Sequence, residues 1–203
     1  MFVDLSTLTP RERYKFLLPV IAPRPIAFVS TLGPNGSGNL APFSYFTMGG
    51  SSPQSLVFCP LLNSKSERKD TLRNIEATGE FVVNIVTRAM AEGVNQASFA
   101  YPYGTDEFDA AGFTRAPSAM VKPPRVAESP VNLECRLFQI VRHGEGQMAS
   151  NYVIGEVLAV HAKDDVLVNG VPDVRRIAPV TRLGGDDWGE LTPDAIFTMA
   201  RPQ

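Results

Sequence analysis

The chain has 203 residues, of which 44% are hydrophobic and 20% are charged, and its formal net charge at pH 7 is −2. This composition is globular rather than disordered, and a chain of this length can bury a core without disulfides or a metal ion. The net charge is close to zero, and the sequence shows no basic stripe that would neutralise phosphates. Both observations argue against nucleic acid as a partner.

The N-terminus lacks the charged-then-apolar pattern of a signal peptide. Its most apolar stretch, Phe16–Leu32, is interrupted by three prolines and an arginine, so we expect no membrane span. The two cysteines, Cys59 and Cys135, lie in apolar runs, which favours buried free thiols over a disulfide. No Cys/His spacing is typical of a zinc site, so no metal is expected. These features together predict a soluble cytoplasmic protein.

The first predicted element is a helix that begins with Thr9-Pro10-Arg11-Glu12 and ends before Pro19. Thr9 can cap it, Pro10 suits the first helical position, and Glu12 completes a capping box. The later predicted elements are strands at Pro25–Leu32, Asn39–Thr47 and Ser55–Leu62, a helix at Thr71–Thr78 ended by Gly79, a strand at Glu80–Val86, a helix at about Arg88–Ser98, and long strands at Val131–Arg142 and Val153–Lys163.

Most of these strands are joined by tight turns, which predicts a mainly β, antiparallel barrel with a few flanking helices. We expect a single domain over residues 1–203, with its core at about 20–190. The strand–helix–strand passage Ser55–Val86 could instead begin an α/β sheet, but nothing after Val86 continues that alternation. The segment Phe99–Pro130 is rich in Pro, Gly, Tyr and Phe, and is interpreted as a lid or a subunit-contacting segment.

Polar groups are concentrated on the first predicted hairpin, whose two strands flank the turn-rich hexapeptide Gly33–Gly38. The polar residues there are Arg24, Ser30, Thr31, Asn39, Ser44 and Thr47. A hairpin whose only role was to cover a hydrophobic core would not need these polar side chains. They indicate a site for a polar, flat, phosphorylated ligand.

A second polar segment, Ser64–Thr71, precedes the predicted helix at Thr71–Thr78. It carries the hydroxyls of Ser64, Ser66 and Thr71 and the cations Lys65, Arg68 and Lys69. A helix start with free N–H groups and added cations is a good site for a phosphate. The alternative is an ordinary solvated helix start, with Asp70 or Thr71 as its cap.

Taken together, these blocks resemble a known family. The segments Arg24–Thr31 (RPIAFVST), Asn39–Phe46 (NLAPFSYF), Lys69–Ile75 (KDTLRNI) and Gly79–Asn84 (GEFVVN) are similar to those of the flavin reductase-like, FMN-binding split-barrel family that includes flavoredoxin. Ile154–Val157 and Arg182–Gly185 match its later pattern more loosely. The resemblance extends from about Arg24 to Trp188.

The resemblance implies a homodimer of antiparallel, Greek-key split β-barrels with FMN bound non-covalently at or near the subunit interface. It assigns Ser30 and Thr31 to the FMN phosphate or ribityl chain. It assigns the flavin ring to Asn39, Leu40, Ala41 and Ser44, and the rest of the phosphate site to Ser64, Lys69 and Thr71. Arg24 either contacts the ring or phosphate, or pairs with a carboxylate that holds the hairpin.

The implied activity is that of an oxidoreductase that passes electrons from NADH or NADPH through FMN to a flavin or another acceptor, either a small molecule or a protein. The alternatives are an FMN electron carrier without its own nicotinamide activity, and a non-catalytic flavin-binding module. Hydride transfer to a flavin requires no general acid or base, so no catalytic residue is assigned. His161 accordingly fits a hydrogen-bonded histidine at a strand end better than a base.

Two aromatic features have alternative interpretations. Trp188 could cover a flavin face, although packing on its own or a partner subunit is favoured. A substrate roof, with core or interface packing as the alternative, could be formed by Tyr45, Phe46, Phe99, Tyr101 and Tyr103.

Overall fold

The computed structural model describes residues 1–102 and 104–202. Its helices are α1 (Pro10–Leu17), α2 (Asp70–Thr78), α3 (Ala91–Gln96), α4 (Glu107–Ala110) and α5 (Val174–Ile177), with short 3-10 turns at Leu5–Thr7, Arg88–Met90, Asp164–Val166 and Pro193–Ala195. Its strands are β1 (Arg24–Pro25), β2 (Ala27–Leu32), β3 (Gly38–Phe43), β4 (Phe46–Ser51), β5 (Gln54–Phe58), β6 (Glu80–Ile85), β7 (Arg115–Ala116), β8 (Arg125–Val126), β9 (Val131–His143), β10 (Ser150–Ala162), β11 (Leu167–Val168), β12 (Val171–Pro172), β13 (Val180–Gly184) and β14 (Asp187–Glu190).

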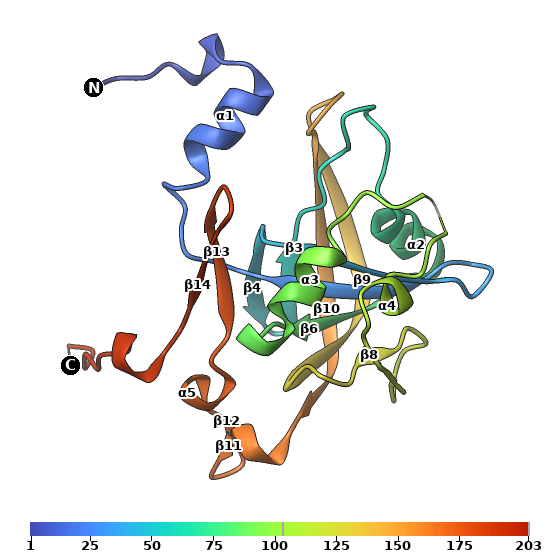
Figure 1. Ribbon diagram of the computed structural model, residues 1–203, viewed down its shortest axis with the longest axis vertical. Helices are drawn as coiled ribbons and strands as arrows, with labels where there is room; N and C mark the ends of the chain where they lie inside the picture. The colour runs from blue at the N-terminus through green and yellow to red at the C-terminus, as the bar shows by residue number, and fades with distance from the viewer. Residues whose placement is uncertain (103, 203) are drawn as a thin grey trace.

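The main sheet has seven strands in the order β3-β2-β6-β9-β10-β5-β4, and each neighbouring pair is antiparallel (Figure 1). β3 and β4 lie at opposite ends of this order, yet only Ser44 and Tyr45 separate them in the chain. A chain spans at most ~3.6 Å per residue, so the two edges of the sheet must meet at this corner. The sheet therefore curls into a barrel that is left open between β3 and β4. This confirms the antiparallel β prediction and excludes the α/β alternative.

Two predicted strands differ from the structure. The run Asn39–Thr47, predicted as one strand, is broken at Ser44–Tyr45, because the chain turns the barrel corner there. The run Pro25–Leu32 contains two strands, since Arg24–Pro25 pairs with β13 outside the main sheet. The tail around Trp188, predicted as a loop, is a hairpin of β13 and β14.

The predicted helix signals are confirmed. The Thr9 side chain accepts from the Glu12 N–H, and the Glu12 carboxylate accepts from the Thr9 N–H, which completes the capping box of α1. Gly79 ends α2 with a φ of 71°, in the left-handed region that favours glycine. The predicted helix at about Arg88–Ser98 begins as a 3-10 turn and continues as α3. No helix in residues 1–102 and 104–202 is long and apolar enough to cross a membrane.

The core consists of two clusters on opposite faces of the sheet, because successive strand side chains alternate between faces. One cluster contains Val29, Phe58 and Phe81 and packs against α2. The other contains Phe28, together with residues from α3 and α4. Cys59 and Cys135 are both buried free thiols, as predicted.

The segment between α3 and β9 forms a second layer over β2 and β6. Its Phe108, Phe113 and Val126 belong to the second core cluster. Glu134 on β9 is fully buried and accepts hydrogen bonds from the backbone N–H groups of residues 119–121. From α4 onward this segment is packed and hydrogen-bonded, and its role as a lid or a subunit-contacting segment stays a prediction.

Candidate functional site

The cavity that combines the two predicted polar segments has a volume of about 430 Å³ and lies between β3 and the start of α2. Four of the predicted site residues line it: Asn39, Ala41, Lys69 and Thr71. Phe99 and Tyr101 form part of its wall, and their rings pack edge to face with centroids 5.1 Å apart. The residue pattern therefore identified both sides of one cavity from segments thirty residues apart.

A buried hydrogen-bond network fixes the floor of this cavity. The Asn39 amide donates to the hydroxyls of Thr31, at 3.1 Å, and Thr71, at 2.9 Å. The amide of Asn74 donates to the same Thr31 hydroxyl at 3.0 Å. The network ties β2 and β3 to α2, so the strand edge and the helix start keep a fixed relative position.

The start of α2 carries no side-chain cap. Lys69 occupies the capping position and makes no capping hydrogen bond, so neither Asp70 nor Thr71 is the cap. The first N–H groups of a helix have no partner within the helix, and they attract anions. The Lys69 ammonium lies 5.6 Å from the centre of the Phe43 ring, and desolvation there lowers its pKa.

Charges of both signs surround the cavity. Its cationic lining residues are Arg68, Lys69 and Arg73, and its acidic ones are Glu67, Asp70 and Glu107. Arg68 also forms an exposed ion pair with Glu76 at 2.5 Å. Burial raises the pKa values of Asp70 and Glu107 above their ordinary ranges.

Glu107 is a lining residue that the sequence analysis missed. Its carboxylate, 7% exposed, accepts the backbone N–H of Leu40 at 2.9 Å. Hydrogen-bonded and non-hydrogen-bonded pairs alternate in an antiparallel ladder, so the N–H groups of Asn39 and Ala41 point toward β2 instead. The N–H group of Leu40 points away from β2, and the Glu107 carboxylate accepts it. The only local signal is the Asp106 cap of α4, which does not indicate contact with β3.

Six of the predicted residues do not line this cavity, although Thr31 belongs to the hydrogen-bond network beneath it. Ser30 points to the opposite face from Thr31, and its hydroxyl donates to the Pro124 carbonyl at 2.5 Å. Leu40 is buried in the second core cluster, and Ser64 lies in an exposed turn.

Arg24 and Ser44 line a second, smaller cavity of about 210 Å³, which shares Pro42 and Ser98 with the first. The Arg24 guanidinium donates to the carbonyls of Leu18, Ile21 and Leu183. Arg24 therefore ties β1 to the segment after α1 and to β13 through backbone carbonyls, not through the carboxylate partner considered from the sequence.

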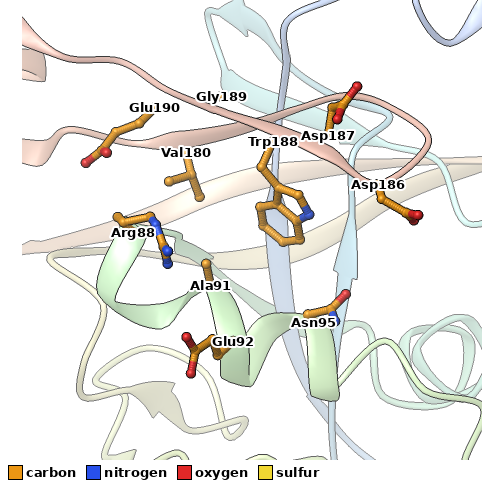
Figure 2. A pocket seen from close by; sticks show the side chains of 10 residues that line it. All are labelled: Arg88, Ala91, Glu92, Asn95, Val180, Asp186, Asp187, Trp188, Gly189 and Glu190. Carbon is orange, nitrogen blue, oxygen red and sulfur yellow. The ribbon is translucent and has the colours of Figure 1, made fainter.

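Trp188 separates the second cavity from a third, of about 510 Å³, and lines both. Its ring points from β14 toward α3, between Ala91 and Asn95 (Figure 2). It packs against the second core cluster, and the Arg182 guanidinium lies 4.7 Å from its ring centre.

The remaining candidates from the sequence have structural contacts. The Nε2 atom of His161 lies 2.5 Å from the Glu134 carboxylate, as expected for a hydrogen-bonded histidine on a strand. Of the aromatic roof candidates, Tyr45 packs against Tyr14 with ring centres 6.4 Å apart. Tyr103 lies outside the described residues.

The chain matches the flavin reductase like domain over residues 21–176, and it belongs to that family. It is 29% identical to nitrilotriacetate monooxygenase component B from Bacillus cereus, with a TM-score of 0.91 and 98% of each chain covered. It is 28% identical to the 2-nitrobenzoate 2-nitroreductase NbaA of Pseudomonas fluorescens, with a TM-score of 0.88 and coverage of 99% of this chain and 96% of that one.

A putative flavin reductase with a split barrel domain from Shewanella frigidimarina shows the same fold at 23% identity, with a TM-score of 0.79 and coverage of 98% and 95%. The family and the mainly β, split-barrel fold expected from the sequence are thereby confirmed. The family supports an oxidoreductase.

Proposed function

We propose that this protein is an FMN-dependent oxidoreductase that takes electrons from NADH or NADPH and passes them to a flavin or another acceptor. The observation that carries the proposal is the cavity between β3 and α2, where Lys69 and an uncapped helix start face the fixed amide network of Asn39. The side of the cavity with Lys69 offers a cation and free helix N–H groups, which suit a phosphate. The side with Asn39 offers a fixed strand edge, which suits a polar planar ring.

Lys69 and Thr71 would hold the FMN phosphate, and Ala41 and Pro42 would border the flavin ring. The Thr71 hydroxyl accepts from Asn39 and keeps its own proton to donate. Bound FMN supplies the hydride and electron-transfer chemistry. The chain contributes position: a rigid strand edge, a cation at the phosphate, and the aromatic wall of Phe99 and Tyr101 that limits water.

A paired-ligand titration tests the phosphate assignment. Lys69→Met should weaken FMN binding by about tenfold or more, because it removes a charge-assisted hydrogen bond, and should leave riboflavin binding unchanged. The control is Lys65→Met, since Lys65 is exposed and does not line the cavity. Equal weakening of FMN and riboflavin would refute the assignment.

The electron donor is tested by the visible spectrum of the purified protein under anaerobic conditions. We expect a yellow protein whose absorbance bleaches on addition of NADH or NADPH. Yellow colour that persists would favour an electron carrier reduced by protein partners. A protein that takes up no FMN would refute both functions.

Similarity to a 2-nitrobenzoate 2-nitroreductase over 99% of this chain favours a second candidate, reduction of an aromatic nitro group. Loss of 2-nitrobenzoate in the presence of NADH or NADPH, followed by chromatography, tests this activity directly.

We also propose a homodimer, as the family resemblance implies. Apolar side chains are exposed on β9 and β10: Phe138, Val141, Tyr152 and Val160. Val141 and Tyr152 are paired across the two strands, so they share one face. Sedimentation velocity should give a dimer mass, and Phe138→Glu should shift it toward the monomer.

A further inference from the structure

Two arginines lie opposite each other on neighbouring strands, and both line the second cavity. Arg24 on β1 is the direct cross-strand partner of Arg182 on β13. Like charges placed directly opposite in a sheet destabilise it. Among the described residues, the ion pairs found within 4.0 Å include neither arginine.

Arg24 has an unmet hydrogen-bonding group. Its side chain is only 6% exposed, and its buried Nε has no hydrogen-bond partner among residues 1–102 and 104–202. An unpaired buried donor costs about 1–3 kcal/mol, so such a group indicates a missing acceptor. Arg182 uses one nitrogen on the Gly185 carbonyl and stacks on Trp188. A guanidinium has five N–H donors, so Arg182 can still bind an anion.

The lining of this cavity separates it from its neighbour. The second cavity is lined by Arg24, Arg182, Ser44 and Trp188, among others, and no acidic residue of the described part of the chain lines it. The carboxylates of Glu92, Asp186, Asp187 and Glu190 line the third cavity, beyond Trp188 (Figure 2). Trp188 thus divides a basic compartment from an acidic one.

We propose that the second cavity binds the carboxylate of a planar, single-ring aromatic acid, with Arg182 as the main anion contact and Trp188 as its apolar wall. A volume of about 210 Å³ is below the usual ~300–1,000 Å³ of pockets for larger ligands, so it suits one ring. The cavity adjoins the proposed flavin ring at Pro42 and Ser98, so a bound acid could receive electrons from the flavin. This role as electron acceptor rests on the proposed function. Its binding does not depend on that function.

Benzoate and benzamide form the test pair, since they share a shape and differ in charge. Calorimetric titration of the full chain, as purified and again after addition of FMN, should show benzoate binding at least about tenfold tighter than benzamide, as expected for charge-assisted hydrogen bonds. Trp188 is the only tryptophan of the chain, so its fluorescence should change in the same saturable way.

The benzoate preference is the ratio of the affinity for benzoate to the affinity for benzamide. Arg182→Gln should reduce this ratio to about threefold or less, because the substitution removes the charge and keeps a hydrogen-bond donor. Arg182→Lys should keep part of the preference, since lysine binds as a point charge. The matched control is Arg88→Gln, which removes a charge from the third cavity and should leave the preference unchanged.

The proposal would be overturned by equal binding of benzoate and benzamide, by an unchanged preference in Arg182→Gln, or by displacement of FMN by benzoate. Tighter binding of nicotinamide than benzoate would also overturn it, by making the cavity part of a hydride-donor site. A benzoate preference in a protein that binds no flavin would refute the proposed function alone.

Discussion

The amide of Asn39 donates a hydrogen bond of 2.9 Å to the hydroxyl of Thr71, and this contact joins edge strand β3 to the first turn of α2. Both residues are buried, with exposures of 4% and 0%. The contact places the two sequence segments of the proposed phosphate site against each other. The stability of this junction and the shape of the cavity are therefore linked.

Replacing Thr71 with valine tests this link. Thr71→Val leaves a buried Asn39 donor with one acceptor fewer, which should lower the free energy of unfolding by about 1–3 kcal/mol in urea titrations. Thr78→Val is the control on the same helix, because the Thr78 hydroxyl donates to the Asn74 carbonyl in a partly exposed position. Equal losses in the two variants would contradict the importance of the Asn39–Thr71 contact.

Two substitutions at Glu107 should change the free energy of unfolding in opposite directions at about pH 8. Burial raises the pKa of Glu107 above its ordinary 4.5, so the folded state binds the proton more tightly and loses stability as pH rises through that raised pKa. Glu107→Gln keeps an acceptor for the Leu40 N–H and removes this loss, so it should be more stable than the parent at about pH 8 but not at pH 4. Glu107→Ala should lose about 1–3 kcal/mol at both pH values, since it leaves the Leu40 N–H unpaired.

Urea titrations of the three proteins at both pH values measure these differences. A Glu107→Gln variant that is less stable than the parent at about pH 8 would show that the ionised carboxylate stabilises the fold.

Glu134 should make stability depend on pH in the opposite sense. Burial alone raises the pKa of Glu134, but hydrogen bonds from the N–H groups of Ala119 and Met120, together with His161, lower it below 4.5. The stability that Glu134 contributes is therefore complete above pH 4.5 and is lost as pH falls through the lowered pKa. Glu134→Gln should cost about 1–3 kcal/mol at neutral pH and show a smaller loss on acidification.

The measurement is the free energy of unfolding from about pH 7 to 3, with the exposed Glu145→Gln as control. Parallel pH profiles for the parent and Glu134→Gln would rule out this role.

Gly155 should tolerate no side chain. A Cβ at this position would lie 2.3 Å from Cζ of Phe81, which is fully buried and packs edge to face on Phe58. Gly155→Ala should therefore lower stability by about 1–3 kcal/mol through overpacking. Gly50→Ala is the matched control, because its nearest contact would be 3.7 Å away. Partial rescue of Gly155→Ala by Phe81→Leu would identify the ring as the cause, and absence of rescue would place the strain elsewhere.

Local sequence signals were sufficient to predict features that depend only on neighbouring residues. The capping box of Thr9 and Glu12 and the left-handed Gly79 each depend on a few neighbouring residues, and both helix ends are found where predicted. The grouping of Asn39, Lys69 and Thr71 was also predicted, although through resemblance of whole segments rather than through periodicity. Their roles in ligand binding stay predictions.

What the sequence by itself determined is thus the main helices and long strands, the antiparallel β class and the family. The tertiary structure alone decided the contacts between distant segments: Glu107 on the Leu40 N–H, the pairing of Arg24 with Arg182, and the position of Trp188 between two cavities. These contacts follow from how the barrel closes and where the tail hairpin docks. Each joins residues far apart in the chain, and no local propensity encodes such a pairing.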